Sequence, residues 1–288
     1  MTQSKKRPIS HSIAAFGASS VATLITYPLD VVKVRFQIDR TKGALPSILS
    51  QTSSIVHKEG LFILWSGIFP ALIASGISWS GFFYFYEVAK KRWSPERSGM
   101  IRDAAASVEA GSIMVLITNP IWLIKTRLQL PNSPYLGFLD AFTRIIQEEG
   151  IRALYRGVVP ALLLTSHGVI QLTIYEELKR FREPSGSTAG LALVYGSIAK
   201  LSAALITYPY QVVKTRVQQR YTNPNSKYAY DLPAGELART IRCIRDTWQV
   251  EGFRGFLKGC WPNSLRVIPN AGITFWVYEM IVRRLPSS

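Results

Sequence analysis

The chain carries the same sequence element three times, at intervals of about 90 residues. In each copy a proline near the end of an apolar stretch is followed, five and seven positions later, by two basic residues; the three prolines are Pro28, Pro120 and Pro209. Each element is followed further along the chain by Glu-Gly and then by a second glycine; the three acids are Glu59, Glu149 and Glu251. The prolines are 92 and 89 residues apart in a chain of 288 residues. This period predicts three tandem copies of one supersecondary unit.

Charged residues are absent from three long stretches of the sequence. The stretches between Arg7 and Asp30, Glu59 and Glu87, and Arg156 and Glu176 hold 22, 27 and 19 residues. A helix needs about 20 residues to span a bilayer. Charged residues make up 18% of the whole chain, against about 25% in soluble domains. We therefore expect a membrane protein.

The charge that remains is strongly basic, at +16. The bases gather at the ends of apolar runs, for example at Lys33 and Arg35. That placement suits the anionic headgroups of membrane lipids, cardiolipin among them, and an anionic substrate, rather than nucleic acid. The two cysteines, Cys243 and Cys260, have neither metal-ligand nor disulfide spacing. We expect no cofactor and no metal, and no set of residues indicates an enzyme.

Each repeat is expected to have the same internal plan. We place the repeats at 1–94, 95–185 and 186–288, with polar sequence at both joins. A long helix ends just past the two bases, a short amphipathic helix precedes Glu-Gly, and a second long apolar helix follows the last glycine. The sequence thus predicts an all-α membrane protein with six transmembrane helices. Both termini lie on one side, and three short helices lie on the other.

The tripled pattern resembles the mitochondrial carrier family. Its motif is Pro-x-[Asp/Glu]-x-x-[Lys/Arg]-x-[Lys/Arg], then [Asp/Glu]-Gly, four residues, an aromatic, a base and Gly, and the resemblance covers essentially the whole chain. The resemblance implies a pseudo-threefold barrel in the inner mitochondrial membrane, with both termini facing the intermembrane space. It also implies a single central substrate site that opens alternately to the two sides. A closed six-helix bundle can work as a monomer.

The resemblance further implies a gate on the matrix side, in which the acid of one repeat pairs with the base of the next. Asp30 keeps its acid, and Lys125 is its expected partner, whereas Trp122 and Gln211 replace the other two acids. Lys214 and Lys33 are therefore left without a carboxylate. Three glutamines two residues past each second base are expected to brace the gate: Gln37, Gln129 and Gln218. We expect a matrix gate that opens easily, aided by aromatic packing at Trp122.

A second gate is implied on the cytoplasmic side, at the ends of the even-numbered helices. Its pattern is an aromatic residue, an acid and, three positions later, a base. The candidate acids and bases are Glu87 with Lys90, Glu176 with Lys179, and Glu279 with Arg283. In the third pair the base comes one residue late, so the partner of Glu176 is open.

The motif at Asn119–Arg127 is similar to carriers of nucleotide-like cofactors, the group that carries NAD, pyrimidine nucleotides, folate or FAD. The motifs at Thr207–Arg216 and Ser166–Glu176 are similar to the folate or FAD branch in particular. Gly157 to Glu176 is 19 residues, one fewer than the 20 residues at the corresponding places in the other two repeats, and this shortening is also similar to that branch. Carriers of NAD or of pyrimidine nucleotides are the alternative within the family. A membrane enzyme and a non-transporting scaffold are the alternatives from other classes.

Charges inside apolar helices are costly and usually functional, which makes Lys200, Arg266 and Glu109 candidate substrate contacts. We expect the two bases to bind the anionic part of the cargo. Glu109 either accepts from a ring N–H or pairs with Lys200. Further candidates lie at comparable heights: Trp79 and Ser75, for stacking of a ring or for close helix packing, and His167 and Gln171, for hydrogen bonds to a flavin or pterin edge or for packing inside the bundle.

Overall fold

A computed structural model describes residues 6–41, 46–93, 99–182, 189–219 and 235–284. Within these ranges the chain is helical and contains no β-strand. The long odd-numbered rods are α1 (Lys6–Ile38), α4 (Gly99–Leu128) and α8 (Ala189–Gln218). The even-numbered rods are α3 (Ile68–Arg92), the pair α6 (Val158–Leu163) and α7 (Ser166–Arg182), and α10 (Cys260–Arg284). The expected all-α fold is confirmed.

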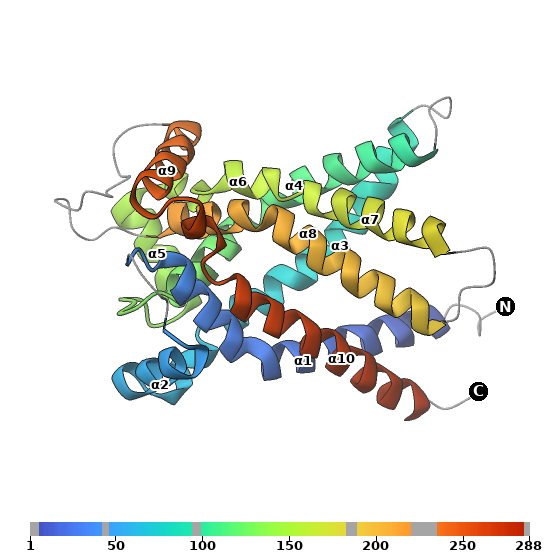
Figure 1. The fold of residues 1–288 in the computed structure, drawn as a ribbon, viewed down its shortest axis with the longest axis horizontal. Coiled ribbons are helices and arrows are strands. Elements are labelled where there is room, and N and C mark those ends of the chain that lie inside the picture. The colour runs from blue at the N-terminus through green and yellow to red at the C-terminus, as the bar shows by residue number, and fades with distance from the viewer. Residues whose placement is uncertain (1–5, 42–45, 94–98, 183–188, 220–234, 285–288) are drawn as a thin grey trace.

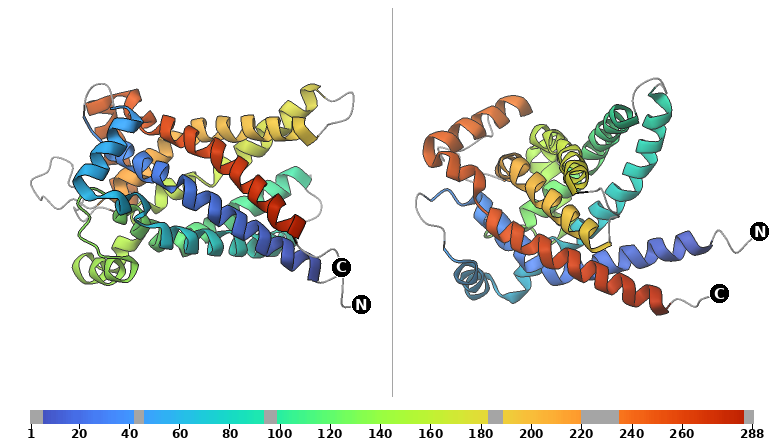
Figure 2. Two further views of the ribbon diagram at one scale, coloured as in Figure 1. Left: turned by 90° about the horizontal axis from the view of Figure 1, so that it is seen from below. Right: turned by 45° about the vertical axis from the view of Figure 1, so that its right-hand side comes forward.

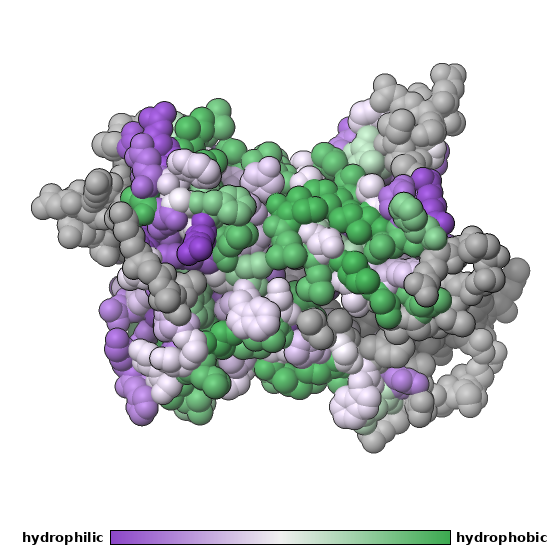
Figure 3. Space-filling view, viewed as in Figure 1, coloured by the Kyte–Doolittle hydropathy of each residue, from purple (hydrophilic) through white to green (hydrophobic). Residues whose placement is uncertain are grey.

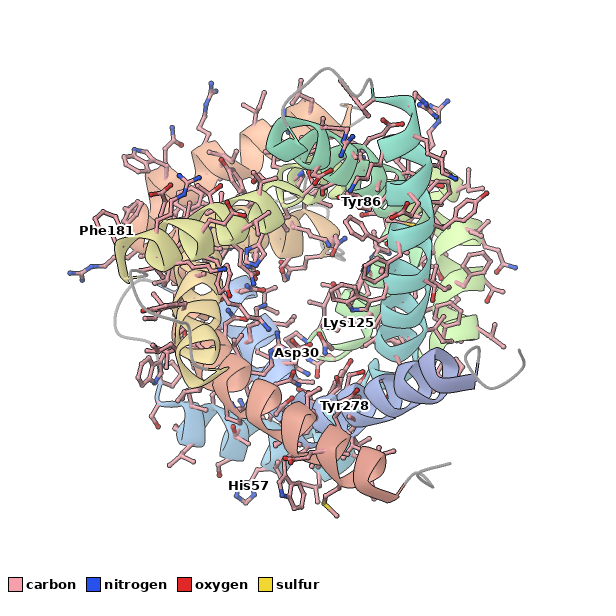
Figure 4. All side chains as sticks on the ribbon, turned by 90° about the vertical axis from the view of Figure 1, so that its right-hand side faces the viewer. Asp30, His57, Tyr86, Lys125, Phe181 and Tyr278 are labelled. Carbon is pink, nitrogen blue, oxygen red and sulfur yellow. The ribbon has the colours of Figure 1, made fainter. Side chains whose placement is uncertain are left out.

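Short helices gather at one end of the molecule, opposite the start of α1 and the end of α10 (Figures 1 and 2). They are α2 (Ile48–Glu59), α5 (Phe138–Glu149) and α9 (Glu236–Glu251). Each is followed by one 3₁₀ turn: η1 (Leu61–Trp65), η2 (Ile151–Tyr155) or η3 (Phe253–Leu257). Seen along the long axis of the molecule, the rods form a ring (Figure 4). The two ends of the ring are therefore built from different elements.

The repeated prolines lie inside α1, α4 and α8. A proline removes one helical hydrogen bond and leaves the carbonyl four residues earlier without its usual donor. For Pro28 that carbonyl belongs to Leu24, and the indole Nε1 of Trp65 donates to it at 2.9 Å. A side chain from the same repeat thus replaces the lost backbone donor, as membrane helices require.

The second glycine of each repeat lies where an even-numbered rod begins. Gly67, Gly157 and Gly259 all have positive φ, near 80°. A Cβ atom at Gly259 would lie 2.9 Å from the carbonyl oxygen of Lys33. Gly67 and Gly157 approach Lys125 and Lys214 in the same way. Glycine is needed at these points because each even-numbered rod starts against the backbone of the next repeat.

The outer surface suits a bilayer. Three helical stretches are long and apolar enough to cross a membrane by length and composition: Leu61–Arg92, Arg102–Leu128 and Ile151–Phe181. Large apolar side chains are exposed on the flanks, and they include Leu24, Ile25 and Leu116. The view in Figure 3 shows an apolar band between two hydrophilic ends. The exposed apolar band is what a protein surrounded by lipid presents.

The fourth rod is broken, which the sequence did not predict. Between α6 and α7 the amides of Thr165 and His167 donate to carbonyls three residues earlier, at 3.1 and 3.0 Å. Such 3₁₀ bonding turns the chain further and rises more per residue than an α-helix does. The tighter turn therefore offsets, in part, the residue that is missing between Gly157 and Glu176.

Candidate functional site

A cavity of about 670 Å³ lies within the ring of helices. Its described lining residues come from all three repeats: Thr23, Thr26, Tyr27, Asp30, Lys33, Val34, Gln37, Ala71, Ser75, Trp79, Trp122, Lys125, Thr126, Leu164, His167, Gln211, Lys214, Thr215, Gln218 and Arg266. Asp30 and Lys125 lie inside the ring when the molecule is viewed from the end that carries the termini (Figure 4). The cavity is thus a central site to which every repeat contributes.

The end of the cavity beside the short helices is closed by three contacts of three different kinds. The Lys125 ammonium donates to the Asp30 carboxylate, the pairing that the sequence predicts. The Lys33 ammonium donates to the amide oxygen of Gln211 at 3.1 Å. The Lys214 ammonium lies 5.8 Å from the centre of the Trp122 ring, within cation–π distance. Each base therefore reaches the neighbouring repeat, although only one of them meets a carboxylate.

The three predicted bracing glutamines lie directly beneath these contacts. Gln129 donates to the Asp30 carboxylate at 3.2 Å. Gln218 accepts from the Thr126 hydroxyl at 3.0 Å, and Gln37 accepts from the Thr215 hydroxyl at 2.8 Å. The corresponding position in the first repeat is Val34, which has no hydroxyl. The brace from Gln129 therefore goes to the acid itself, and the other two braces go to threonines.

The second base of each element holds the repeats together, a role that the sequence reasoning missed. Arg35, Arg127 and Arg216 each form a two-pronged ion pair with the acid of their own Glu-Gly. Each also donates through Nε to the carbonyl of a bracing glutamine in the next repeat. The signal was present, since this arginine and the Glu-Gly acid each occur once in every repeat.

One of these ion pairs, between Arg35 and Glu59, lies at the edge of the membrane-spanning part. Hydrogen bonds from the Arg35 guanidinium hold the pKa of the Glu59 carboxyl below its ordinary value. The folded state therefore favours the charged form of this acid.

Arg266 lies between the closed end and the open part of the cavity. Its Nε is 3.5 Å from the second carboxylate oxygen of Asp30. Lys200 lies within electrostatic reach of both Arg266 and His167, although it is not one of the residues that line the cavity. Of the two predicted anion-binding side chains, Arg266 thus lines the cavity, and Lys200 adds positive charge near it.

The charge of the cavity is strongly asymmetric. Among the described lining residues four are cations, namely Lys33, Lys125, Lys214 and Arg266, and one is an acid, Asp30. That single carboxylate is already shared by Lys125, Arg266 and Gln129. A cavity with this excess of positive charge favours an anionic guest.

Ser75, Trp79 and His167 line the cavity. Trp79 is 66% exposed and stacks on Phe83, with the ring centres 6.1 Å apart. His167 contacts Thr207 of α8 through Nδ1 at 3.0 Å. Gln171 is half-buried and is not a lining residue of the cavity. The structure therefore brings three of these four candidates to the cavity wall.

Glu109 requires a correction. Its carboxylate accepts from the Arg92 guanidinium at 2.7 Å and from the Trp93 indole at 3.0 Å. It therefore pairs with the end of α3 and not with Lys200, and it is not among the lining residues of the cavity. The acid ties α3 to α4 in this structure, and its predicted contact with cargo has no geometric support here.

The other end of the ring is open. Lys90, a predicted gate base, pairs with Asp103 of α4 at 3.2 Å, and Glu87 is exposed. Tyr86, Phe181 and Tyr278, on three different rods, lie well apart around the ring in Figure 4. The side chain of Arg283 lies outside the described part of the chain. The gate roles of Glu176, Lys179 and Glu279 stay predictions.

Comparisons with known proteins match the whole chain. A family model described as mitochondrial carrier protein matches three times, over residues 4–97, 96–186 and 185–288. The chain is 41% identical to Folate transporter 1, chloroplastic, of Arabidopsis thaliana, over 94% of this chain and 93% of that protein. It is 33% identical to Nicotinamide adenine dinucleotide transporter 1, chloroplastic, of the same plant, over 97% and 93%. It is also 33% identical to Mitochondrial nicotinamide adenine dinucleotide transporter 1 of Saccharomyces cerevisiae, over 90% and 72%.

Proposed function

This chain belongs to the mitochondrial carrier family, and from that premise we propose that it carries folate or FAD across the inner mitochondrial membrane. Members of the family are membrane transporters and not enzymes, which removes the membrane-enzyme alternative. In the proposal the cargo binds in the central cavity, and the cavity opens alternately to the two sides. The structure corresponds to the state that is open at the end carrying the termini, the proposed intermembrane-space side.

The observation that carries the proposal is the charge of the central cavity. Four cations and one engaged carboxylate line it, so an anionic group in the cavity is attracted. The volume of about 670 Å³ falls within the range of about 300–1,000 Å³ typical of sites for small molecules. Trp79 adds an exposed aromatic face on which a flat ring can stack. A flat heterocycle with anionic groups matches all three properties.

The names of similar proteins support the same class of cargo. The relative at 41% identity is named as a folate transporter, and two relatives at 33% are named as transporters of nicotinamide adenine dinucleotide. Both kinds of molecule combine flat rings with anionic groups. Two of these three names also specify the chloroplast, so the organelle is part of the proposal and calls for imaging of the tagged protein in its own cell.

Uptake into liposomes tests the proposal. The purified protein is reconstituted, and uptake of folates, FAD, FMN, NAD, UTP and thiamine pyrophosphate is compared with that of protein-free liposomes. We expect folate or FAD to enter fastest. Uptake of NAD or UTP alone would replace the proposed cargo by the alternative within the family. If none of the six compounds enters faster than in protein-free liposomes, the transport proposal is refuted.

Two substitutions test the placement of the anion. Lys200→Ala and Arg266→Ala each remove one of two cations that lie within electrostatic reach of each other, and we expect each to abolish uptake while the folded protein persists in detergent. Lys58 lies exposed on α2, away from the cavity, so Lys58→Ala is the matched control and should transport normally. Wild-type rates in both test variants would remove these two side chains from the site.

A further inference from the structure

His167 occupies an unusual place in the cavity wall. It lies in the first turn of α7, directly after the break in the fourth rod, and its amide closes one of the two 3₁₀ bonds there. Its side chain is half-buried and lines the cavity. The break therefore sets the direction in which the imidazole is presented.

The hydrogen bonds around Thr207 determine which ring nitrogen carries the proton. The Thr207 hydroxyl lies 2.8 Å from the carbonyl oxygen of Ala203, which can only accept, so the single hydroxyl hydrogen points there. The same hydroxyl oxygen lies 3.0 Å from Nδ1 of His167. With its hydrogen on that carbonyl, the hydroxyl accepts from the imidazole, and this arrangement assigns the hydrogen of the neutral ring to Nδ1. In the neutral ring the other nitrogen, Nε2, is then a hydrogen-bond acceptor without a hydrogen of its own.

We propose that His167 is the acceptor that selects a cargo whose flat ring carries an N–H group, with Thr207 as the positioning residue that fixes the tautomer. The inference rests on the proposed function and names what this part of the site recognises. The pterin of folate and the isoalloxazine of FAD both carry such a group at ring position N3. A ring without this hydrogen leaves Nε2 unpaired when the cargo displaces water.

Few of the described groups that line the cavity are hydrogen-bond acceptors that are not already engaged. The lysines and Arg266 of the lining only donate, and the Asp30 carboxylate already accepts from Lys125 and Gln129. The amide oxygen of Gln211 accepts from Lys33. The hydroxyls of Ser75 and Thr23 can accept but can equally donate. The amide oxygens of Gln37 and Gln218 accept from threonine hydroxyls. Among these described lining groups, Nε2 of His167 is thus an acceptor that can distinguish a donor from an acceptor on the ring.

Arg266 supplies the complementary charge. It lines the same cavity as His167, so a cargo that places its N–H at Nε2 can place an anionic group at Arg266. Lys200 adds positive charge near both side chains. The combination of one ring N–H with a separate anionic group describes folate and flavin nucleotides, and it excludes anions that have no ring.

Methylated cargo isolates this hydrogen bond from all other contacts. Uptake of folate or FAD is compared with that of the same compound methylated at N3, and the ratio of the two rates is measured for each variant. In the wild type we expect the methylated compound to be slower by about tenfold or more, because a good donor is lost and Nε2 is left unpaired. In His167→Ala we expect this ratio to fall close to one. His167→Gln, which retains an acceptor, should keep part of the preference.

Thr207 is tested by the same ratio. Thr207→Val removes the hydroxyl with little change of shape and should lower the preference for the unmethylated ring. Thr207→Ser keeps the hydroxyl and should retain this preference. Thr173→Val on the outer side of α7 is the matched control, since its exposed hydroxyl bonds only within its own helix, to Val169 at 3.0 Å. It should leave both rates and their ratio unchanged.

The outcomes separate the inference from the proposed function. A wild-type ratio near one, or an undiminished ratio in His167→Ala, overturns the role of His167 while transport itself stands. Absence of folate and FAD uptake overturns the proposed function instead. UTP also carries a ring N–H at N3, so in that case the ratio of UTP to its 3-methyl derivative decides the role of His167.

Discussion

Gln211→Glu is predicted to tighten the gate at the closed end of the cavity. The two side chains have the same shape, so the change replaces a neutral oxygen by a charged one without disturbing the packing. Lys33 donates to that oxygen at 3.1 Å in the present structure. The same ammonium is repelled by Arg266, Lys125 and Lys214. A carboxylate at this position would therefore meet an excess of positive charge.

The size of the effect follows from the geometry. At an effective dielectric constant of about 20, two unit charges about 4 Å apart attract each other by roughly 4 kcal/mol. Partial burial of the new carboxylate costs a large share of that attraction, which leaves a net stabilisation of about 1–2 kcal/mol for the closed gate. Since the gate must open in every transport cycle, a barrier raised by this amount slows transport by about five- to thirtyfold.

Initial rates of cargo uptake into liposomes, normalised to the amount of folded protein, measure this effect. Gln147→Glu is the matched control, because it makes the same chemical change on the exposed face of α5 and should leave the rate unchanged. Gln211→Leu should act in the opposite direction, since it removes the acceptor of Lys33 and weakens the closed state. An unchanged or faster rate in Gln211→Glu, with the control also unchanged, would refute the reasoning that this contact limits opening.

Three further predictions concern stability and the opposite gate. Because the pKa of Glu59 is lowered in the folded state, the charged acid stabilises the fold at neutral pH, and this contribution is lost as the pH falls from about 4.3 through the folded-state value. The difference in melting temperature between wild type and Glu59→Gln should accordingly be full at pH 7 and vanish in acid. Gly259→Ala should lower the melting temperature by forcing a Cβ atom against backbone at positive φ, at a cost of about 1–3 kcal/mol. Gly272→Ala, where a Cβ atom would meet open space, should not lower it. Asp103→Asn releases Lys90 from its partner in the open state, so the open end should close more readily, measured as slower labelling of a single cysteine placed in the cavity wall; unchanged labelling would contradict this.

The threefold sequence repeat made much of the closed end of the cavity predictable. Asp30 lies two residues after Pro28 and Lys125 five residues after Pro120, so both lie near the same end of neighbouring rods, and they pair as predicted. The missing carboxylates opposite Lys33 and Lys214 were also evident from the sequence. The contacts that replace these carboxylates were not evident from the sequence. Whether a lysine reaches an amide oxygen or the face of an indole ring depends on the rotation of each rod.

Other features of the site could not be predicted from the sequence alone. Glu109 was placed at the height of the cargo by counting from Pro120, but the sequence does not state which neighbouring helix ends beside it. Arg92, the last residue of α3, and Trp93 directly after it lie there and bind its carboxylate. The single missing residue between Gly157 and Glu176 was visible in the spacing. The tight turn at Leu164 and Thr165, which partly offsets this missing residue and directly precedes His167, could be seen only in the backbone structure.

The contacts that Arg35, Arg127 and Arg216 make between repeats have a consequence for the order of the repeats along the chain. Arg216 of the third repeat holds the carbonyl of Gln37 in the first in the same way as Arg35 holds that of Gln129 in the second. The third joint has no peptide connection across it, yet α1 and α10 pack against each other there as α3 and α4 do (Figure 2). Closure of the ring thus depends on contacts and not on the covalent order. A circularly permuted chain, with its old ends linked and new ends opened between α3 and α4, retains every joint that the native protein has.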